Sequence, residues 1–290
     1  MKKLLITGAD GQLGRAVNRE LAGTEYELYN TDVFDRDEIH ALDITDVDKV
    51  RECVLEVKPY AVINCAAYTA VDAQENDRDR AFQINALGPR NLAIAAEEAG
   101  AKLIHISTDY VFSGNHATPY IETDETGPVS TYGRTKLAGE EFVKSFCRRY
   151  FIVRTAWLYG DGKNFVRTML KLSETHSEVS VVKDQLGSPT SASELARALH
   201  YFLPTDNYGL FHGTCEGDTN WADFTEKIFK TAGVETKVNH VTTAEYKEMN
   251  PKSTDRPAYS ILDNYMLRLT GGYKFAHWEE AVEEYLRGEV

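Results

Sequence analysis

The sequence predicts an α/β fold of the Rossmann type, a doubly wound parallel sheet with a smaller C-terminal lobe. Three observations lead to this prediction. Short apolar runs alternate with amphipathic segments through the first 160 residues, a glycine-rich turn follows the first apolar run, and the alternation loosens after Gly160. Strands that alternate with helices form parallel sheets, because each connecting helix covers one face of the sheet.

The individual elements follow from apolar spacing and from turn residues. Leu4, Leu5 and Ile6 form a continuous apolar run that predicts a buried strand, and a helix over 13–22 begins directly after the glycine turn. Gly100 is expected at the end of a long helix, where a left-handed backbone favours glycine. The other expected strands are 26–29, 61–63, 103–106 and 150–153, and the other helices are one from 45 or 46 to Pro59, one at 78–99 and one at 132–147.

The chain divides into two parts at a soft boundary. Residues 1–160 are expected to form a dinucleotide-binding domain, and residues 161–290 mainly a substrate-binding lobe. Strands near 179–182 and 209–212 and a helix at 221–231 are spaced by polar loops. We therefore expect some later segments to return to the first domain.

Composition excludes several classes of function. The net charge of −13 argues against a nucleic-acid partner, whose phosphates would be repelled. No apolar run approaches the roughly 20 residues of a membrane span, and the apolar stretch after Met1 is too short for a signal peptide. Four widely spaced cysteines predict free thiols and no metal site. A cytoplasmic protein with a small-molecule substrate is expected.

Gly8, Gly11 and Gly14 follow the first strand and open the first helix. Glycines allow a tight turn and a close approach to a pyrophosphate, and the amides at the helix start favour anions. Asp32 follows the second strand and is placed to accept hydrogen bonds from an adenosine ribose. Taken alone, the glycines could form an ordinary tight turn and Asp32 could be a solvated aspartate. The glycines and Asp32 together predict a nicotinamide coenzyme.

Charge also predicts which coenzyme is preferred. A 2′-phosphate beside Asp32 would be repelled, and the glycine turn carries Asp10 but no basic residue. Arg36 is the nearby compensating cation. We therefore expect NADH to be preferred over NADPH.

Tyr132 and Lys136 stand four residues apart on a predicted helix, and hence on one face. A phenol has a pKa of about 10, and a neighbouring ammonium lowers the pKa and helps it to act on a carbonyl group. Thr108 ends the fourth strand, 24 residues before Tyr132, at the edge where open α/β sheets bind ligands. The alternatives are a surface pair on the helix and a threonine that caps the strand end.

These residues carry a resemblance to the extended short-chain dehydrogenase/reductases, and further segments resemble the dTDP-4-dehydrorhamnose reductases among them. The resemblance covers nearly the whole chain. The segments that carry it are T-G-A-D-G-Q-L-G at 7–14, N-C-A-A-Y-T-A-V-D at 64–72, S-T-D-Y-V-F at 107–112, Y-G-R-T-K at 132–136, R-T-A-W-L-Y-G at 154–160, Q-L-G-S-P-T at 185–190 and R-P at 256–257 followed by Ser260.

The resemblance implies reduction of dTDP-4-dehydro-β-L-rhamnose to dTDP-β-L-rhamnose by NAD(P)H, the last step in making this activated deoxysugar. It implies Tyr132 as proton donor, Lys136 as its partner and Thr108 as the carbonyl anchor. The implied coenzyme-binding residues are Gly8, Gly11, Gln12, Leu13, Gly14, Asp32, Asp43, Ile44, Ala66, Ala67, Tyr68, Tyr132 and Lys136, and the implied substrate residues are Thr108, Asp109, Tyr110, Tyr132, Trp157 and Arg256.

Two of these roles have structural alternatives. Trp157 is expected to pack on the sugar ring, but a tryptophan there can also be a core aromatic. Arg256 is a candidate for the diphosphate or for a structural salt bridge.

One departure concerns magnesium. Some relatives dimerise around magnesium held by glutamates, one of them in the first helix, whereas residues 14–17 here carry no carboxylate. We therefore doubt a magnesium site and expect a monomer or a weak homodimer.

Three rival functions use the same fold. A dehydratase would need a second base after Thr108, where Tyr110 follows Asp109 in place of a glutamate. An epimerase would keep its coenzyme bound and consume none. A non-catalytic regulatory subunit, such as relatives that bind methionine adenosyltransferase, would not need the Tyr132–Lys136 pair.

Overall fold

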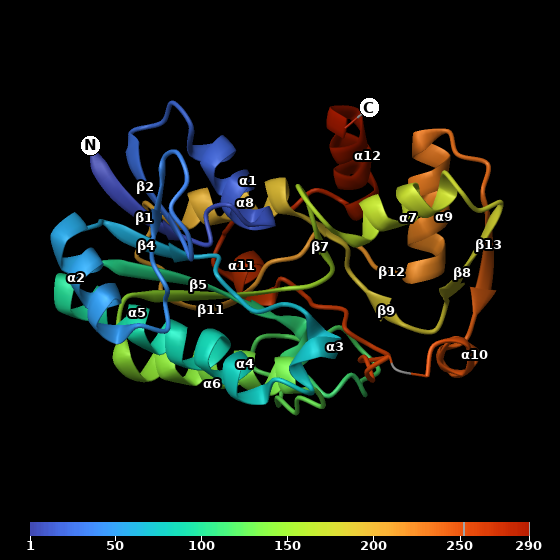
Figure 1. The fold of residues 1–290 in the computed structure, drawn as a ribbon, viewed down its shortest axis with the longest axis horizontal. Helices are drawn as coiled ribbons and strands as arrows, with labels where there is room; N and C mark the ends of the chain where they lie inside the picture. Colours follow the sequence, from blue (N-terminus) through green and yellow to red (C-terminus); the bar gives the residue numbers. More distant parts are fainter. Residues whose placement is uncertain (252, 290) are drawn as a thin grey trace.

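A seven-stranded sheet in which every pair of neighbours is parallel forms the centre of the computed structural model, which describes residues 1–251 and 253–289 (Figure 1). The strand order is β3-β2-β1-β4-β5-β6-β11. The strands are β1 (Lys2–Thr7), β2 (Tyr26–Asp32), β3 (Ile39–Ala41), β4 (Ala61–Asn64), β5 (Lys102–Thr108), β6 (Tyr150–Thr155) and β11 (Gly209–His212). The predicted doubly wound parallel sheet is confirmed.

The order of the sheet reverses between β1 and β4. The chain builds β1, β2 and β3 outward in one direction and then returns to add β4, β5 and β6 on the other side of β1. At such a switch point the loops after two neighbouring strands turn away from each other and leave a crevice at the carboxyl ends. The residues after β1, β4 and β5 therefore face one site.

Helices cover both faces of this sheet (Figure 1). On one side, α2 (Val47–Val57), α5 (Gly88–Ala99) and α6 (Thr131–Phe146) enclose a core that contains Val62 and Leu103. On the other side, α1 (Gln12–Leu21) and α8 (Ala192–Phe202) enclose a core that contains Leu4, Ile63 and Phe151. Strands buried on both faces read as continuous apolar runs, which is why the sequence revealed them.

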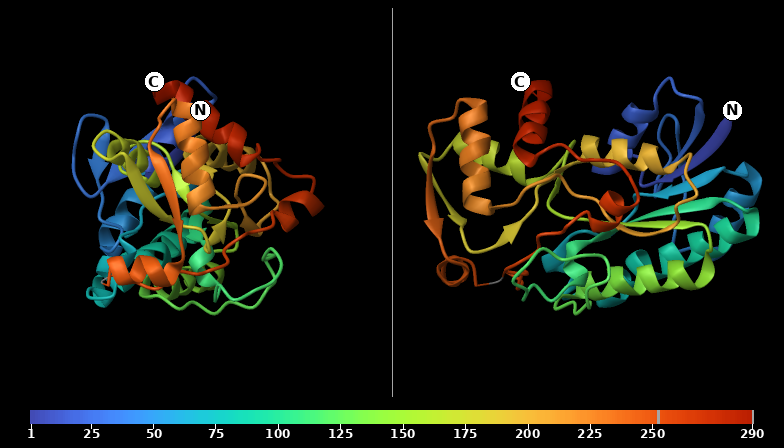
Figure 2. Two further views of the ribbon diagram at one scale, coloured as in Figure 1. Left: turned by 90° about the vertical axis from the view of Figure 1, so that its right-hand side faces the viewer. Right: turned by 180° about the vertical axis from the view of Figure 1, so that it is seen from behind.

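A second unit with its own apolar core lies beside the sheet (Figure 2). Its core includes Val166, Phe224, Ile228 and Trp278. It consists of α7 (Phe165–Ser173), β8 (Glu178–Val182), α9 (Trp221–Ala232), β13 (Lys237–Val241), α10 (Thr243–Met249) and α12 (Trp278–Glu289). We call it the lobe; within it, β8 and β13 pair in parallel.

Several later segments lie with the sheet and not with the lobe. They are α8, β11 and α11 (Tyr265–Leu269), which packs near β11. Short strand pairs link the two units: β7 (Leu158–Tyr159) with β10 (Thr190–Ser191), and β9 (Leu186–Gly187) with β12 (Thr219–Asn220). The chain therefore passes between the two units several times after residue 160.

The helix predicted over 78–99 is divided into three consecutive segments. These are α4 (Arg78–Phe82), a π-helical turn (Gln83–Leu87) and α5, whose second residue is Pro89. Proline has no N–H and clashes with the carbonyl four residues earlier, and the wider π turn relieves this clash. That carbonyl, on Asn85, lies against Gly139 of α6, where a Cβ would come within 2.3 Å of it.

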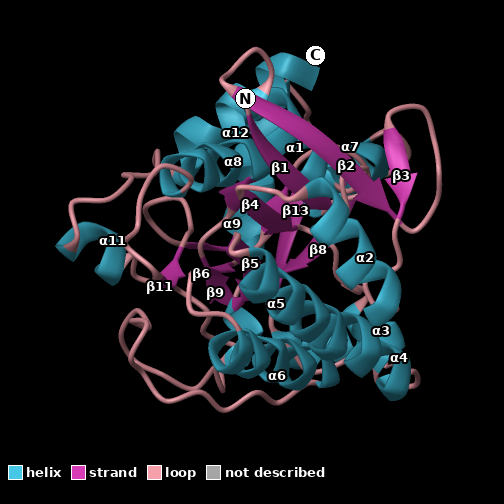
Figure 3. Ribbon diagram, turned by 90° about the vertical axis from the view of Figure 1, so that its left-hand side faces the viewer, coloured by secondary structure: helices cyan, strands magenta, loops and turns pink. Residues whose placement is uncertain are grey.

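Several short elements were not predicted, β3 and α3 among them. The edge strand β3 has three residues and α3 (Val71–Gln74) has four, too few to produce a hydrophobic period. Figure 3 shows β3 beside β2 at the edge of the sheet. The remaining predicted elements of the first 160 residues appear with bounds that differ by a few residues, and Gly100 ends α5 with a φ of 71°.

None of the described helices is long and apolar enough to cross a membrane.

Candidate active site

The glycine turn forms a close-packed cradle at the carboxyl end of β1. Gly8 has a φ of 65°, and a Cβ there would lie 2.7 Å from the Ala66 nitrogen. A Cβ on Gly14 would lie 2.2 Å from the Gly8 oxygen. Gly11 caps α1 without a side-chain hydrogen bond, and the first turn holds no acidic residue. The amides that begin α1 are therefore available to an anion, and the turn fits a pyrophosphate.

Gln12 and Leu13 begin α1 directly after this turn. The Leu13 side chain is buried in the core beneath α1. The Gln12 side-chain amide donates a hydrogen bond to the Leu158 carbonyl at 3.0 Å. The backbone amides of these two residues, at the start of α1, are therefore the groups that we expect to contact a phosphate.

The Asp32 carboxylate lies at the end of β2 and is held by the backbone. It accepts hydrogen bonds from the Asp10 amide at 3.1 Å and from the Val33 amide at 2.8 Å. Asp10 in turn pairs with Arg15 at 3.0 Å and with Arg36 at 2.6 Å. Two guanidinium groups thus stand near the position expected for the adenosine ribose. The sequence analysis missed Arg15, which follows Gly14 directly but belongs to none of the motifs.

Asp43 and Ile44 lie in the connection that leads into α2. The exposed Asp43 carboxylate accepts hydrogen bonds from both the amide and the hydroxyl of Thr45, at 2.9 and 2.8 Å. Ile44 is buried, and its side chain leaves no room for a Cβ on Gly88. Their role at the adenosine stays a prediction.

A row of buried polar side chains ties the three central strands together. Thr7 of β1 donates to the Asn64 side-chain oxygen at 2.7 Å, and the Asn64 amide lies 3.0 Å from His105 Nδ1 on β5. Burial lowers the pKa of His105 well below its usual value, so the ring stays neutral. The Asn64 oxygen also accepts the Ala66 amide at 3.2 Å, which fixes the start of the loop after β4.

The loop after β4 continues with Ala66, Ala67 and Tyr68, all half-buried. Asn85 accepts the Tyr68 amide at 2.8 Å and donates to the Tyr68 carbonyl at 3.0 Å. Because Gly8 lies against Ala66, this loop and the glycine turn form the two walls of the switch-point crevice. The structure thus brings together residues predicted to bind the coenzyme, although the sequence places them about 60 positions apart.

Tyr132 and Lys136 lie on the first turns of α6, beside the end of β5. The Tyr132 and Tyr110 rings meet edge to face with centroids 5.4 Å apart. A Cβ on Gly133 would lie 2.1 Å from the Tyr110 carbonyl oxygen, so glycine permits α6 to approach this turn. The three predicted catalytic residues, Thr108, Tyr132 and Lys136, therefore come from adjacent elements, and the Thr108 side chain affects the Tyr132 pKa directly.

The expected lowering of the Tyr132 pKa by Lys136 is wrong for this structure. Burial raises the Tyr132 pKa to about 12; the Thr108 hydroxyl lowers it and the Asp109 charge raises it further. The Lys136 ammonium donates to the Ile106 carbonyl at 2.5 Å, and burial lowers its own pKa to about 8. The phenol is consequently protonated at neutral pH, which is the form that a proton donor requires.

Thr108 does cap the end of its strand, as the structural alternative held. Its oxygen accepts the Tyr110 amide at 3.2 Å, and its hydroxyl donates to Asp109 at 2.8 Å. Burial raises the pKa of Asp109 to about 6. The hydroxyl must turn from Asp109 to serve a substrate carbonyl, so the anchoring role stays a prediction.

A buried ion pair behind Lys136 was missed by the sequence analysis. Arg154 of β6 contacts both Glu140 carboxylate oxygens, at 2.9 and 2.7 Å, and the Ser107 hydroxyl donates to the same carboxylate at 2.5 Å. Glu140 also raises the Lys136 pKa against the effect of burial. Glu140 follows Lys136 by one helical turn, and this spacing was the signal available in the sequence.

Trp157 lies where the sheet meets the lobe. Its ring stacks on Trp221 with centroids 3.5 Å apart and an interplanar angle of 8°. Its φ is 49°, a conformation that is costly for a bulky residue. A Cβ on Gly187 would lie 2.4 Å from the indole, so Gly187 makes room for it. Trp157 is half-buried and contacts the apolar clusters of both regions, and its packing on a sugar stays a prediction.

Arg256 forms a salt bridge, which was the structural alternative to a diphosphate contact. Its guanidinium lies 3.6 Å from the Asp72 carboxylate, which also accepts the Thr254 amide at 3.0 Å. Arg256 is close enough to Tyr110 to affect its pKa. The arginine therefore stands near Tyr110, a predicted substrate residue, although 146 positions separate the two in the sequence.

Comparison with known proteins identifies the family. The chain matches the family described as "RmlD substrate binding domain" over residues 1–289. The crystal structure of a dTDP-4-dehydrorhamnose reductase from Clostridium acetobutylicum superposes with a TM-score of 0.94 at 50% identity, with 99% of each chain covered. The chain belongs to the dTDP-4-dehydrorhamnose reductase family. The resemblance inferred from the sequence motifs is confirmed.

Two further relatives support this membership. A dTDP-4-dehydrorhamnose reductase from Bacillus anthracis, crystallised in complex with NADP, has a TM-score of 0.92 at 41% identity, with all of both chains covered. The spore coat polysaccharide biosynthesis protein SpsK of Bacillus subtilis is 40% identical, over 99% of this chain and 98% of that protein. The family consists of nicotinamide-dependent oxidoreductases, which the glycine cradle and the Tyr132 site fit.

Proposed function

We propose that this chain reduces the 4-keto group of dTDP-4-dehydro-β-L-rhamnose with NAD(P)H, giving dTDP-β-L-rhamnose. The observation that carries the proposal is the position of the Tyr132 phenol, which lies on α6 beside Thr108 and Tyr110 at the carboxyl end of β5. It borders the same crevice as the glycine cradle. Membership of the reductase family supports the choice of substrate.

Each group has a separate role in this reaction. A reduced nicotinamide held in this crevice would supply the hydride for the carbonyl carbon. The Thr108 hydroxyl holds the carbonyl oxygen, and Tyr132 gives it a proton as charge develops there. The Lys136 ammonium stabilises the phenolate that remains. The amides after Gly11 hold the pyrophosphate, and Asp32 accepts the adenosine ribose hydroxyls.

Both coenzymes are proposed to serve, with NADH preferred. Asp32 is fixed by two backbone amides and would repel a 2′-phosphate, whereas Arg15 and Arg36 offset this charge. Steady-state kinetics with each coenzyme test the preference. Arg36→Ala is expected to raise the KM for NADPH and to leave that for NADH nearly unchanged. A several-fold lower wild-type KM for NADPH than for NADH would contradict the preference.

A monomer or weak homodimer without magnesium is the proposed state in solution. The only acidic residue of α1 is Glu20, and its carboxylate lies 2.8 Å from His200 Nδ1. Sedimentation velocity with and without magnesium tests this. A dimer that forms only with magnesium would overturn it.

A cytoplasmic location is also proposed. All four cysteines are free in the structure, which suits a reducing compartment. Retention of activity in the soluble fraction of a cell lysate, apart from membranes, tests this location.

The central test is to generate the labile keto-sugar enzymatically, add this protein, and identify the product by NMR. We expect NADH oxidation at 340 nm only when the keto-sugar is present. Conversion without net NADH consumption would favour an epimerase, and loss of water from the sugar would favour a dehydratase. Folded, coenzyme-binding protein without turnover would favour a regulatory subunit.

A further inference from the structure

The Thr108 hydroxyl carries a single hydrogen, and in this structure that hydrogen is given to Asp109. The bond to Asp109 Oδ1 is 2.8 Å long, and the Thr108 oxygen also accepts the Tyr110 amide at 3.2 Å. The proposed reduction needs the same hydrogen at the carbonyl oxygen of the substrate. Because a hydroxyl donates only one hydrogen bond, Thr108 cannot serve Asp109 and the carbonyl together.

The Asp109 carboxyl lies in a site that disfavours its charge. Asp109 is 2% exposed, and its Oδ2 atom is buried without a hydrogen bond from any described residue. Burial raises the pKa of Asp109 to about 6, although hydrogen bonds from the Thr108 and Ser260 side chains oppose this. A buried carboxyl with one unbonded oxygen is less costly when it is neutral.

The chain that returns from the lobe holds Ser260 beside this carboxyl. Ser260 is buried; its amide donates to the Leu186 carbonyl at 2.8 Å, and its hydroxyl lies 3.2 Å from the same oxygen. The Tyr259 amide donates to the Gly114 carbonyl at 3.2 Å, and a Cβ on Gly114 would lie 2.5 Å from the Pro257 Cβ. Ser260 is therefore fixed by backbone contacts on both sides.

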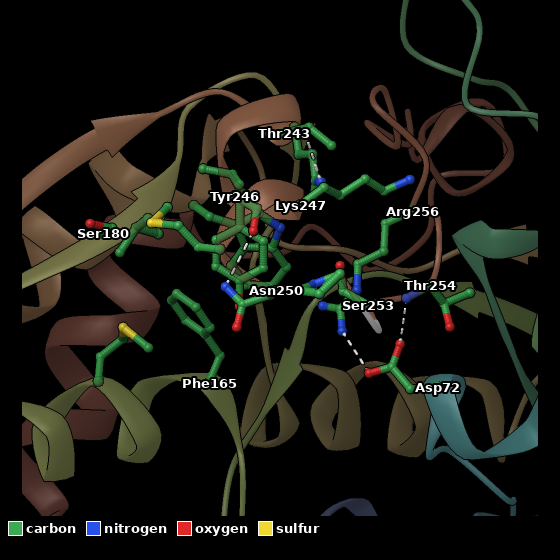
Figure 4. Close-up of a pocket in the computed structure, with 17 residues that line it drawn as sticks. Asp72, Phe165, Ser180, Thr243, Tyr246, Lys247, Asn250, Ser253, Thr254 and Arg256 are labelled. Atoms are coloured by element: carbon green, nitrogen blue, oxygen red, sulfur yellow. Dashed lines mark hydrogen bonds and ion pairs between the residues drawn. The ribbon is translucent and has the colours of Figure 1, made fainter.

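The same segment is also held where it leaves the lobe. The Asp72 carboxylate of α3 accepts the Thr254 amide at 3.0 Å and lies 3.6 Å from the Arg256 guanidinium, as Figure 4 shows. The motifs at 185–190 and 256–260 received no role from the coenzyme or from the proton donor. Their meeting point at Asp109 gives them one.

Two phenols are the titratable groups that face Asp109. Tyr110 follows it on the same turn, and Tyr132 approaches from α6; burial raises the pKa of both, and the Asp109 charge raises each further. Beyond Tyr110 lie Arg256, which lowers its pKa, and Asp72, which raises it. During the proposed reaction, negative charge develops on the carbonyl oxygen and remains on Tyr132. An ionised Asp109 would repel both charges, and a neutral one would not.

We propose that Asp109 is a positioning residue that serves in its protonated form. A neutral Asp109 donates its own hydrogen to the Thr108 oxygen, which reverses this hydrogen bond and frees the Thr108 hydrogen for the substrate carbonyl. Asp109 takes its proton from solvent and keeps it through the reaction, because the reduced oxygen receives its proton from Tyr132. This inference rests on the proposed function, which supplies the carbonyl.

The pH dependence of kcat/KM tests which form is active, because this ratio reports the free enzyme. Asp109 is protonated below a pH of about 6 and ionised above it. The wild-type kcat/KM should therefore fall about tenfold between pH 5 and pH 7. This step is separate from the decline near pH 8 that Lys136 predicts. A flat or rising profile between pH 5 and pH 7 would overturn the proposal.

Two variants change this step in different ways. Asp109→Asn keeps an N–H donor toward the Thr108 oxygen at every pH, so the ratio of kcat/KM between pH 5 and pH 7 should drop to about one. Ser260→Ala removes a hydroxyl that lowers the Asp109 pKa, so the step should move to higher pH. Ser113→Ala is the matched control: Ser113 is exposed in the following loop, its oxygen accepts the Asn115 amide at 3.3 Å, and the step should stay in place. A folded but inactive Asp109→Asn enzyme would show that the carboxylate is required and would overturn the proposal.

Infrared spectroscopy follows the Asp109 carboxyl without any turnover. The band of a protonated carboxyl that Asp109→Asn lacks, or that Ser260→Ala shifts to higher pH if Asp109→Asn does not fold, should disappear as the pH rises through about 6. Loss of this band near a pH of about 4, the ordinary value for aspartate, would overturn the inference even in an active enzyme. A wild-type protein without turnover would overturn the proposed function, and the infrared titration would still decide whether Asp109 holds a proton near neutral pH.

Discussion

The protonation states of the two α6 side chains are set mainly by burial. The Tyr132 pKa rises to about 12 and the Lys136 pKa falls to about 8, as low-dielectric surroundings disfavour both charged forms. At neutral pH the phenol is therefore a neutral acid and the amine is mostly charged. A reductase needs this combination, because the proton leaves the phenol and the ammonium then faces a phenolate.

Replacing Tyr132 tests its role as the proton donor. Tyr132→Phe should lower kcat by about 10²–10⁴-fold, the usual contribution of a general acid, while coenzyme affinity is retained. Stopped-flow or steady-state NADH oxidation measures this effect. Tyr208→Phe is the control, because the Tyr208 hydroxyl bonds Asp206 and not a site residue. A fully active Tyr132→Phe enzyme would require another donor.

The Lys136 pKa predicts a fall in activity at alkaline pH. The amine is charged below pH 8 and neutral above it, so kcat/KM should decline as the pH rises through about 8. Tyr132 stays protonated across this range and adds no limb of its own. Lys136→Arg should move the decline to a higher pH, since the guanidinium stays charged. A wild-type profile that is flat from pH 7 to 10 would exclude this assignment.

At the scale of elements, the β1–α1 turn depends on the absence of a side chain at Gly14. A Cβ there would lie 2.2 Å from the Gly8 carbonyl oxygen and 2.6 Å from the Ala9 Cα, and both of these atoms belong to the backbone. Gly14→Ala should therefore shift the start of α1, cost about 1–3 kcal/mol of unfolding free energy and weaken coenzyme binding. Fluorescence titration with NADH and chemical denaturation measure the two effects. Gly288→Ala, in open space on α12, should change neither.

The contact between α6 and β6 depends on the Glu140–Arg154 ion pair. The two side chains are 0% and 2% exposed, so removing one charge leaves the other buried without a partner. Glu140→Gln should lower the unfolding free energy by about 3–5 kcal/mol. It should also move the alkaline limb of activity to lower pH, because Glu140 raises the Lys136 pKa. An unshifted limb would limit Glu140 to a structural role.

At the scale of the molecule, the predicted coenzyme crevice belongs to the sheet unit. The sheet unit and the lobe each have their own apolar core, so the crevice is supported locally. A ligand that binds only the folded protein stabilises it by mass action. NADPH at a hundred times its Kd should therefore add about 2.7 kcal/mol to the unfolding free energy.

Denaturation with and without NADPH measures this gain. Gly14→Ala at the same NADPH concentration is the matched control and should show a smaller gain. An equal gain in that variant would place the coenzyme outside the glycine cradle.

The sequence by itself determined the parallel sheet and the glycine turn at the end of its first strand. Strands buried on both faces leave continuous apolar runs, and the glycines at 8, 11 and 14 mark where the chain must turn tightly. The spacing of Tyr132 and Lys136 likewise placed both on one face of a helix. These features are local, and local features are what periodicity and spacing encode.

Only the tertiary structure decided the protonation states and the contacts between distant segments. The direction of the Tyr132 pKa shift depends on burial among distant segments, and the sequence had indicated the opposite sign. The contact of Asp72 with Arg256 joins residues more than 180 positions apart, and the Trp157–Trp221 stack joins two separate elements. Such pairs leave no periodic signal, because their proximity arises from how the whole chain packs.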